Sequence, residues 1–159
     1  MPSNALRGGI FPEKEERTMS EYTQGWLTEK AICTDMRAGT DNEIIDGLLA
    51  LLENSGKVCD AARLKEDILK RESIASTASD DGTFLPHALS PGVREFCAAV
   101  SIIEQRRICI LIAMPEHTPH SLRLFAALID MLKNAKVRQA LLELKHPASI
   151  KKVMELSLW

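Results

Sequence analysis

The sequence has no apolar run long enough to cross a membrane, little net charge and no closely spaced cysteine pair. Its longest uninterrupted apolar run, Ile108 to Met114, is far shorter than the roughly 20 residues that span a bilayer. Twenty Lys and Arg residues against 22 Asp and Glu residues leave a formal net charge of −2, so no basic field would attract nucleic acid. We therefore expect neither direct membrane insertion nor nucleic-acid binding.

The cysteines lack the spacing of a metal or redox site. Cys33, Cys59, Cys97 and Cys109 form no C-x-x-C pair that would hold zinc or exchange disulfides, so we expect no metal and no cofactor. The first residues also lack the basic start and apolar stretch of a secretion signal. Cys97 and Cys109 lie in apolar segments, where a thiol packs as a small hydrophobe. The pattern predicts reduced thiols, a cytoplasmic location and a core position for Cys97 and Cys109.

The length and composition are those of one globular domain. The 159 residues are 45% hydrophobic and 26% charged, which is ordinary usage for a chain with a single core. Residues 1–20 combine prolines, glycines and a charge cluster without sustained periodicity, and they are interpreted as a flexible leader. No internal repeat is visible. Residues 21–159 are expected to form the single domain.

Two helices are predicted in the first half of the domain. Thr40 to Glu43 forms a T-x-x-E capping box, apolar residues follow at helical spacing, and Gly56 is a suitable stop. Asp60 can cap a second helix that ends near Arg71 and Glu72 and pairs with the first as a hairpin. The segment before them, from Gly25 to Gly39, stays open between packed loop and short strand.

The second half alternates between a polar stretch, apolar strands and helices. Residues 73–91 are rich in Ser, Thr, Asp, Gly and Pro and predict a long loop. Two short strands follow, 96–103 and 108–114, and the second is apolar throughout, as is typical of a central strand covered on both faces. Thr118 and Pro119 open a helix whose predicted buried stripe is Leu122, Phe125, Leu128, Ile129 and Leu132. Shorter helices over 137–144 and 149–156 would close an α/β sandwich, a mixed central sheet flanked by helices on both faces.

An ordered series of residues around His87 carries the functional signal. The stretch from Arg71 to His87 reads RESIASTASDDGTFLPH. It resembles the IIA domains of the phosphotransferase system (PTS), fructose/mannitol type with its nitrogen-regulatory branch, whose hallmark is R-E-x-x-x-S-T-G-x-G-x-G-x-A-x-P-H. The resemblance extends over about residues 26–156, through the GKV turn at Gly56 to Val58 and the proline-terminated strand Ile112 to Pro115.

The resemblance implies a phosphohistidine carrier without a cofactor. His87 would accept a phosphoryl group from a phosphorylated HPr-like protein and pass it to a IIB domain, often onto a cysteine. Arg71 would stabilise the charge, Ser76 and Thr77 would contact the phosphate, and a second family histidine would correspond to His120, or to Ser121 one position later. Phosphoryl acceptance by His87 can also be argued without the resemblance, because a neutral imidazole with a fixed tautomer is a good nucleophile near pH 7.

The chain departs from the family pattern, and simpler roles exist for several of these residues. Ala78 and Asp80 replace hallmark glycines, and the region between Val93 and Met114 is shorter than in the family. Arg71 could instead interact with the end of its own helix, Ser76 and Thr77 could cap a turn, and His120, like His117, could be an exposed cap residue.

Two other function classes follow from these departures. One is a IIA-like regulatory interaction protein, of the nitrogen-regulatory type, that binds a regulatory partner with weak or no phosphotransfer. The other is a metal-binding enzyme that would gather Asp80, Asp81, His87, His117 and His120, although these residues lack a compact ligand spacing such as H-x-x-x-H.

Overall fold

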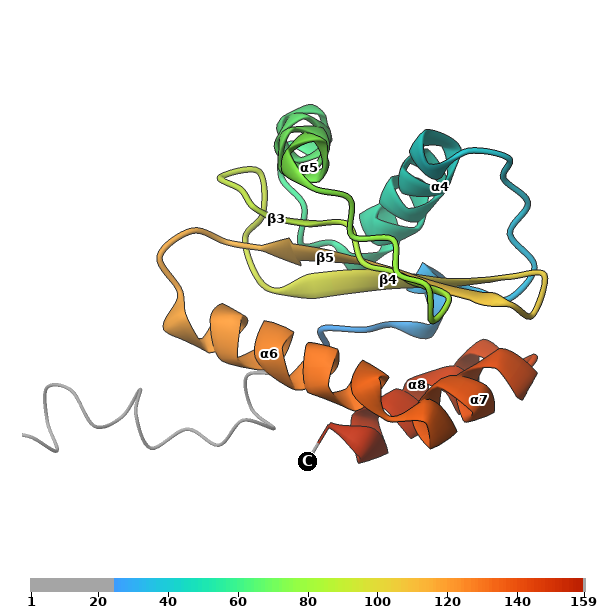
Figure 1. Cartoon of the computed structure of the whole chain (residues 1–159). Helices are drawn as coiled ribbons and strands as arrows, with labels where there is room; N and C mark the ends of the chain where they lie inside the picture. The colour runs from blue at the N-terminus through green and yellow to red at the C-terminus, as the bar shows by residue number, and fades with distance from the viewer. Residues whose placement is uncertain (1–24, 159) are drawn as a thin grey trace, which may run out of the picture.

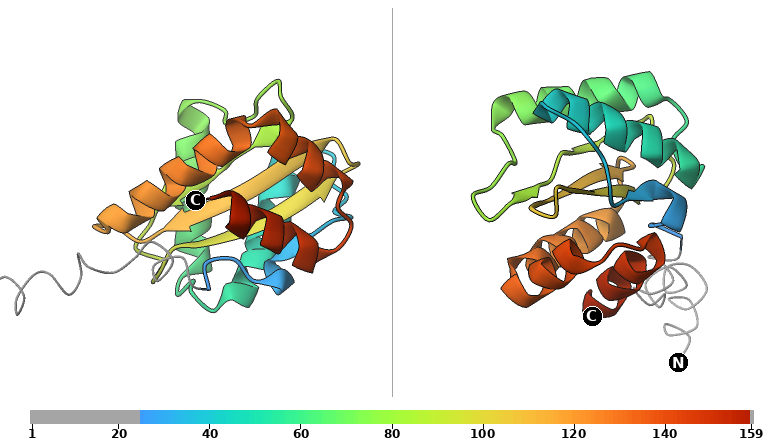
Figure 2. Two further views of the ribbon diagram at one scale, coloured as in Figure 1. Left: turned by 90° about the horizontal axis from the view of Figure 1, so that it is seen from below. Right: turned by 90° about the vertical axis from the view of Figure 1, so that its right-hand side faces the viewer.

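The computed structural model describes residues 25–158, and the predicted leader, residues 1–20, lies outside that range. Within it the chain forms three layers, with a mixed sheet between two groups of helices (Figures 1 and 2). The predicted α/β sandwich is confirmed. No helix among these residues is long and apolar enough to cross a membrane.

The sheet of the described residues has five strands in the order β1-β4-β5-β2, with β3 also paired to β5. β4 (Cys97–Ile103) and β5 (Arg107–Met114) form an antiparallel hairpin, and the short strands β1 (Ile32–Cys33), β2 (Thr83–Phe84) and β3 (His87–Leu89) pair in parallel. β2 and β3 follow one another along the same edge of β5, opposite Ile108 and Ile112 respectively. β5 is therefore the central strand that its apolar sequence predicts.

β5 supplies alternate side chains to two separate cores. Ile108, Ile110 and Ile112 belong to the core between the sheet and the helices of residues 119–157, whereas Cys109 and Leu111 belong to the core between the sheet and the helices of residues 41–74. Because successive side chains of a strand point to opposite faces, a strand buried on both sides must be apolar at every position. This packing also explains the complete burial of the Cys97 and Cys109 thiols.

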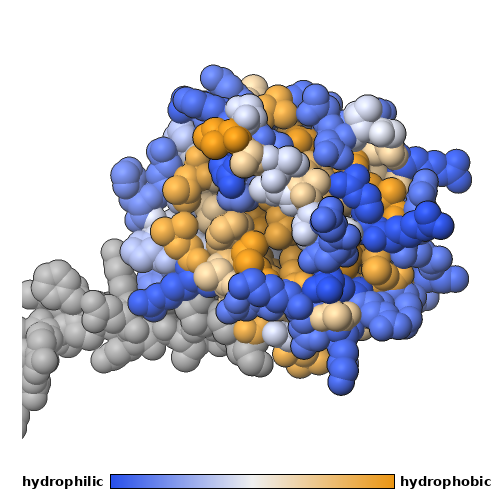
Figure 3. Space-filling view, in the orientation of Figure 1, coloured by the Kyte–Doolittle hydropathy of each residue, from blue (hydrophilic) through white to orange (hydrophobic). Residues whose placement is uncertain are grey.

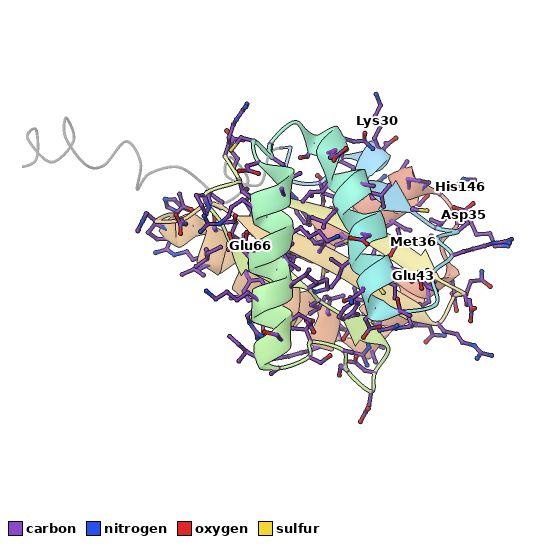
Figure 4. All side chains as sticks on the ribbon, turned by 90° about the horizontal axis from the view of Figure 1, so that it is seen from above. Lys30, Asp35, Met36, Glu43, Glu66 and His146 are labelled. Atoms are coloured by element: carbon purple, nitrogen blue, oxygen red, sulfur yellow. The ribbon has the colours of Figure 1, made fainter. Side chains whose placement is uncertain are left out.

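The upper layer contains α4 (Asp41–Leu52), the short helix η2 (Glu53–Ser55) and α5 (Ala61–Ile74), with α4 and α5 side by side over the sheet (Figure 4). The Thr40 hydroxyl accepts a hydrogen bond from the backbone amide of Glu43, so the predicted N-cap and helix start are confirmed. The Glu43 carboxylate accepts from the Thr40 hydroxyl at 3.0 Å. Asp60 caps α5 through the amide of Arg63. α5 ends at Ile74, slightly beyond the predicted end.

The lower layer contains α6 (Pro119–Lys133), α7 (Ala135–Glu143) and α8 (Pro147–Ser157), and a short helix η1 (Glu29–Ala31) precedes β1. The predicted stripe of α6 is partly wrong, since Leu122 is 53% exposed. Leu128 and Leu132 are buried as expected, but the face that meets the sheet runs through Ser121, Leu124, Leu128, Met131 and Leu132. The helix is thus rotated from the expected orientation, and Leu122 faces the gap toward α5.

The predicted long loop over residues 73–91 is also partly wrong. Phe84 is fully buried and Ala88 is 6% exposed, so β2 and β3 extend the sheet within this segment. The apolar residues in an otherwise polar stretch provide that anchoring. As a result His87 opens a short strand and is held by the sheet.

Candidate functional site

A cavity of about 420 Å³ lies beside His87, between α5, β3, the end of β5 and the first turns of α6. Its wall combines one histidine, two cations, one carboxylate and several apolar side chains. These lining residues are Asp67, Lys70, Arg71, Ile74, His87, Ala88, Leu89, Met114, Leu122 and Phe125.

The sheet and one hydrogen bond fix the position of the His87 imidazole. His87 pairs with Ile112 of β5, and the Pro86 carbonyl just before it accepts from the Ile112 amide at 3.0 Å. The Nδ1 atom of His87 lies 2.8 Å from the carbonyl oxygen of Leu85. Since a carbonyl only accepts, Nδ1 carries the proton and Nε2 carries the lone pair. His87 is therefore held in the tautomer that makes Nε2 a nucleophile.

The environment of His87 favours its neutral form. The imidazole is half-buried and packs against the Phe125 ring, with ring centroids 4.5 Å apart. Burial lowers the pKa of His87 below its usual value, and the Arg71 charge lowers it further. The hydrogen bond to Leu85 and the charge of Glu72 act in the opposite direction, without reversing the net shift. A neutral imidazole thus persists at pH 7, as nucleophilic attack requires.

This environment predicts an unusual titration of His87. We expect the NMR titration midpoint of its ring to lie below the ordinary value of about 6.5, and Phe125→Ser to raise it by admitting water. Because the folded pKa is the depressed one, the unfolded chain binds the proton first, and stability should fall as pH drops below about 6.5. A midpoint at or above that value in the unmodified protein would contradict the burial argument.

Arg71 and Lys70 provide the positive charge of the cavity. Both line it from the last turns of α5. The Nη1 atom of Arg71 donates to the Ala75 carbonyl at 3.1 Å, so this side chain also binds the end of its own helix. The helix-end role considered from the sequence is therefore present, together with a position beside His87.

Ser76 and Thr77 do not line this cavity. The Ser76 hydroxyl accepts from the Ala78 amide, and the Thr77 amide and hydroxyl donate to the Glu72 carboxylate at 2.8 and 2.6 Å. Both residues close the turn that follows α5. To contact a phosphoryl group on His87, Thr77 would have to release Glu72.

The residues considered for the second histidine position lie near the start of α6. His120 is half-buried in the first turn, and Ser121 is 4% exposed with its hydroxyl 3.1 Å from that of Thr118. His117 is exposed in the preceding turn. The cavity is lined from α6 by Leu122 and Phe125, three positions apart on one helix face, and not by His120.

The turn that lacks the hallmark glycines lies outside the cavity wall. Ala78 bridges to Phe84, and the Ser79 amide donates to the Thr83 carbonyl, so the segment folds back on itself. The Asp81 carboxylate accepts from the Thr83 amide and hydroxyl and lies 3.8 Å from Arg138. Hydrogen bonding by Thr83 lowers the pKa of Asp81. The substituted positions therefore leave the space beside His87 open.

The hypothesis of a metal-binding enzyme requires Asp80, Asp81, His87, His117 and His120 to lie close enough together to hold one metal ion. Within residues 25–158 no group of three or more His, Cys, Asp or Glu side chains gathers as a metal site. Asp81 instead faces Thr83 and Arg138, away from the cavity at His87.

Sequence reasoning missed several lining residues. Asp67, Arg71 and Ile74 occupy positions i, i+4 and i+7 of α5, so the sequence predicts that they lie on the same helix face. Leu122 was missed because it was assigned to the core. Leu89 carried no local signal, since its exposure results from the short strand β3.

The cavity opens among exposed apolar side chains. Four large apolar residues in the described part of the chain are strongly exposed, and three of them line this cavity: Ile74 (77%), Leu89 (46%) and Leu122 (53%). We call these three residues the apolar rim. In the space-filling view, hydrophobic surface gathers between the upper and lower helix layers (Figure 3). Contiguous exposed apolar surface of this kind marks an interaction site.

Residues 26–156 match the family described as "Phosphoenolpyruvate-dependent sugar phosphotransferase system, EIIA 2". The chain belongs to this family. The match covers both helix layers and the whole sheet, and it includes every residue of the cavity. The EIIA resemblance of the stretch from Arg71 to His87 is thereby confirmed.

Solved structures of EIIA domains share the fold. The chain is similar to the nitrogen regulatory protein IIA-Ntr from Neisseria meningitidis, with a TM-score of 0.71, 19% identity, and coverage of 82% of this chain and 98% of that one. It is also similar to IIA mannitol from Escherichia coli, with a TM-score of 0.67, 17% identity, and coverage of 80% and 98%. Another similar structure is the Escherichia coli complex of enzyme IIA mannitol with phosphorylated enzyme IIB mannitol.

Curated relatives are much longer than this EIIA chain. The chain is 26% identical over 144 residues to the 2-O-alpha-mannosyl-D-glycerate-specific EIIABC component of Escherichia coli, covering 80% of this chain and 21% of that protein. It is 34% identical over 67 residues to the fructose-specific EIIABC component of Bacillus subtilis, covering 42% and 11%. The chain thus spans about a fifth or less of the length of these relatives.

Proposed function

We propose that this EIIA chain is a histidine phosphocarrier of a sugar phosphotransferase system, with His87 as the phosphorylated residue. The observation that carries the proposal is the His87 imidazole, whose Nδ1 donates to Leu85 while the ring borders a cavity that also contains Arg71. The donor is a phosphorylated HPr-like protein and the acceptor is a IIB domain. The similarity to the IIA chain in the complex with phosphorylated IIB mannitol supports a IIB partner.

The transfer needs little more than alignment and charge. The Nε2 lone pair of His87 forms the new N–P bond while the bond from phosphorus to the donor atom breaks and leaves its electron pair on the donor. In the second step a IIB nucleophile attacks phosphorus, and the N–P electrons return to Nε2. Nδ1 keeps its proton throughout, and Arg71 and Lys70 offset the negative charge of the moving group.

The apolar rim supports a protein, not a small molecule, as the phosphodonor. Ile74, Leu89 and Leu122 surround the approach to His87 and are exposed to solvent. A protein whose phosphorylated residue projects from an apolar surface would bury these side chains on docking. Charged solutes such as free phosphate esters would gain nothing from that burial.

A cytoplasmic location of the protein is part of the same proposal. All four cysteines are free thiols, and burial raises the pKa values of Cys97 and Cys109 to about 11. Such thiols are unreactive core residues. They are compatible with the cytoplasm, where an HPr-like donor would meet this chain.

The direct test is phosphorylation with an isotopically labelled donor. We expect the chain, incubated with the phosphorylated HPr-like protein of its host, to take up label that is acid-labile and base-stable, as a phosphohistidine is. Peptide mass spectrometry should map it to His87, and addition of a IIB domain should discharge it. Absence of label, or label on a different residue, would overturn the proposal.

A second candidate is a regulatory EIIA-like protein that binds its partner independently of phosphotransfer. It is favoured by the similarity to the IIA-Ntr fold and by the engagement of Thr77 with Glu72, which occupies a predicted phosphate ligand. If the chain takes no label, yet retains the same partner whether it carries His87 or the His87→Asp substitution, this candidate replaces the carrier.

A further inference from the structure

Asp67 makes a hydrogen bond that joins the two halves of the site. It lies on α5 one helical turn before Arg71, and both residues line the cavity. The Asp67 Oδ2 atom accepts from the Ser90 hydroxyl at 2.7 Å and from the Arg63 Nε at 3.1 Å. A bond of this length to a carboxylate is a strong, charge-assisted one.

Ser90 is a rigid attachment point for that bond. It is fully buried, one residue beyond β3 and three residues after His87. Its amide donates to the Met114 carbonyl at the end of β5, and its hydroxyl also accepts from the Gly92 amide at 3.1 Å. Ser90 therefore moves only with the sheet that carries His87.

We propose that the Asp67–Ser90 hydrogen bond is a positioning clamp that holds the Arg71 guanidinium beside the imidazole of His87. The clamp rests on the phosphocarrier function proposed above. Without it, α5 would contact this part of the sheet mainly through apolar side chains such as Ile68 and Ala88, which allow sliding. Displacement of a charge-stabilising group by about 1 Å can reduce a rate about 100-fold.

The decisive experiment compares Asp67→Ala with Glu66→Ala. Glu66 is the neighbouring acidic residue of α5, exposed and on the outer surface of the helix (Figure 4), so its removal costs the same charge without touching the clamp. We expect Asp67→Ala to lower the rate of labelling by the phosphorylated HPr-like protein, at saturating donor, by about 10- to 100-fold. Glu66→Ala should leave the rate and the KM for the donor unchanged.

Electrostatics makes the sign of the result diagnostic. Loss of the Asp67 negative charge from the cavity should by itself favour the arrival of a phosphoryl anion, and it cannot raise the pKa of the imidazole. Displacement of Arg71 should do the opposite in both respects, because its charge lowers the pKa of His87. The other charged groups of α5 near His87, Lys70 and Glu72, are unchanged in the variant. A slower transfer together with a higher NMR titration midpoint of His87 therefore reports movement of Arg71.

Two further variants separate clamping from folding. Ser90→Ala changes no charge and should also give slower labelling and a higher titration midpoint of His87. The double variant Asp67→Ala/Ser90→Ala should be labelled no more slowly than either single variant. Asp67→Asn keeps an oxygen acceptor for Ser90 and should stay within about threefold of the unmodified rate. Unchanged rates and midpoints in folded Asp67→Ala and Ser90→Ala, or multiplying effects in the double variant, would overturn the clamp.

The experiments distinguish a wrong clamp proposal from a wrong phosphocarrier proposal. An unmodified chain that takes no label contradicts the phosphocarrier, and the titration of His87, which needs no donor, then decides the clamp alone. A raised midpoint in Ser90→Ala would support the clamp, and an unchanged one would overturn it.

Discussion

Replacing His87 with alanine is expected to abolish phosphoryl transfer while leaving the fold intact. The nucleophilic Nε2 disappears, and no other imidazole lines the cavity. Loss of a nucleophile commonly costs several orders of magnitude, so labelling by the donor should fall by more than about 1000-fold. The backbone pairing of residue 87 with Ile112 does not depend on the side chain, so the sheet should persist.

The matched control for this variant is His146→Ala. His146 is exposed just before α8, and Figure 4 shows it on the opposite side of the molecule from α5. Its loss should leave the labelling rate unchanged. Circular dichroism should show the same secondary structure for both variants, and each should unfold in one cooperative thermal transition. Residual labelling of a folded His87→Ala protein would mean that another residue carries the phosphoryl group.

The elements with strong local signals were predictable from the sequence. The capping box at Thr40 and the cap at Asp60 satisfy orphan amides locally, so both helix starts could be located without tertiary information. The uninterrupted apolar run of β5 is also a local signal, because a strand covered on both faces must be apolar at every position. His87 and Arg71 were identified through the family pattern, and the structure places both at one cavity.

Features that depend on packing between distant segments were not predictable. Both Leu122 and Leu128 fit a helical stripe in the sequence, but only contact with the sheet decides that Leu122 is exposed. The strands β2 and β3 are too short to show alternation and exist because β5 offers an edge. The bond from Asp67 to Ser90 joins residues 23 positions apart, and neither residue type indicates the other.

Replacing Gly92, in the loop that carries Ser90, with alanine is expected to destabilise the protein strongly. Gly92 is buried, and its carbonyl accepts from the amides of Cys59 and Asp60 at 2.8 and 3.1 Å. A Cβ at this position would lie 2.4 Å from the Asp60 carbonyl oxygen, a backbone atom that cannot rotate away. The start of α5 must then move, or the segment from Ser90 to Gly92 must lift from it.

We expect this overpacking to lower the free energy of unfolding by about 3 kcal/mol and the thermal midpoint by about 10 °C. Gly39→Ala is the control, because its Cβ would meet only the flexible Glu43 carboxylate at 3.4 Å, and its effect should stay within about 0.5 kcal/mol. Phosphoryl transfer should also slow in the Gly92 variant at temperatures where it remains folded, since the same displacement pulls α5 and Arg71 away from His87. If the Gly92→Ala protein is as stable as the unmodified chain, the turn at Gly92 is not tightly packed against Asp60. Ser90 would then not be held in a fixed position by this turn.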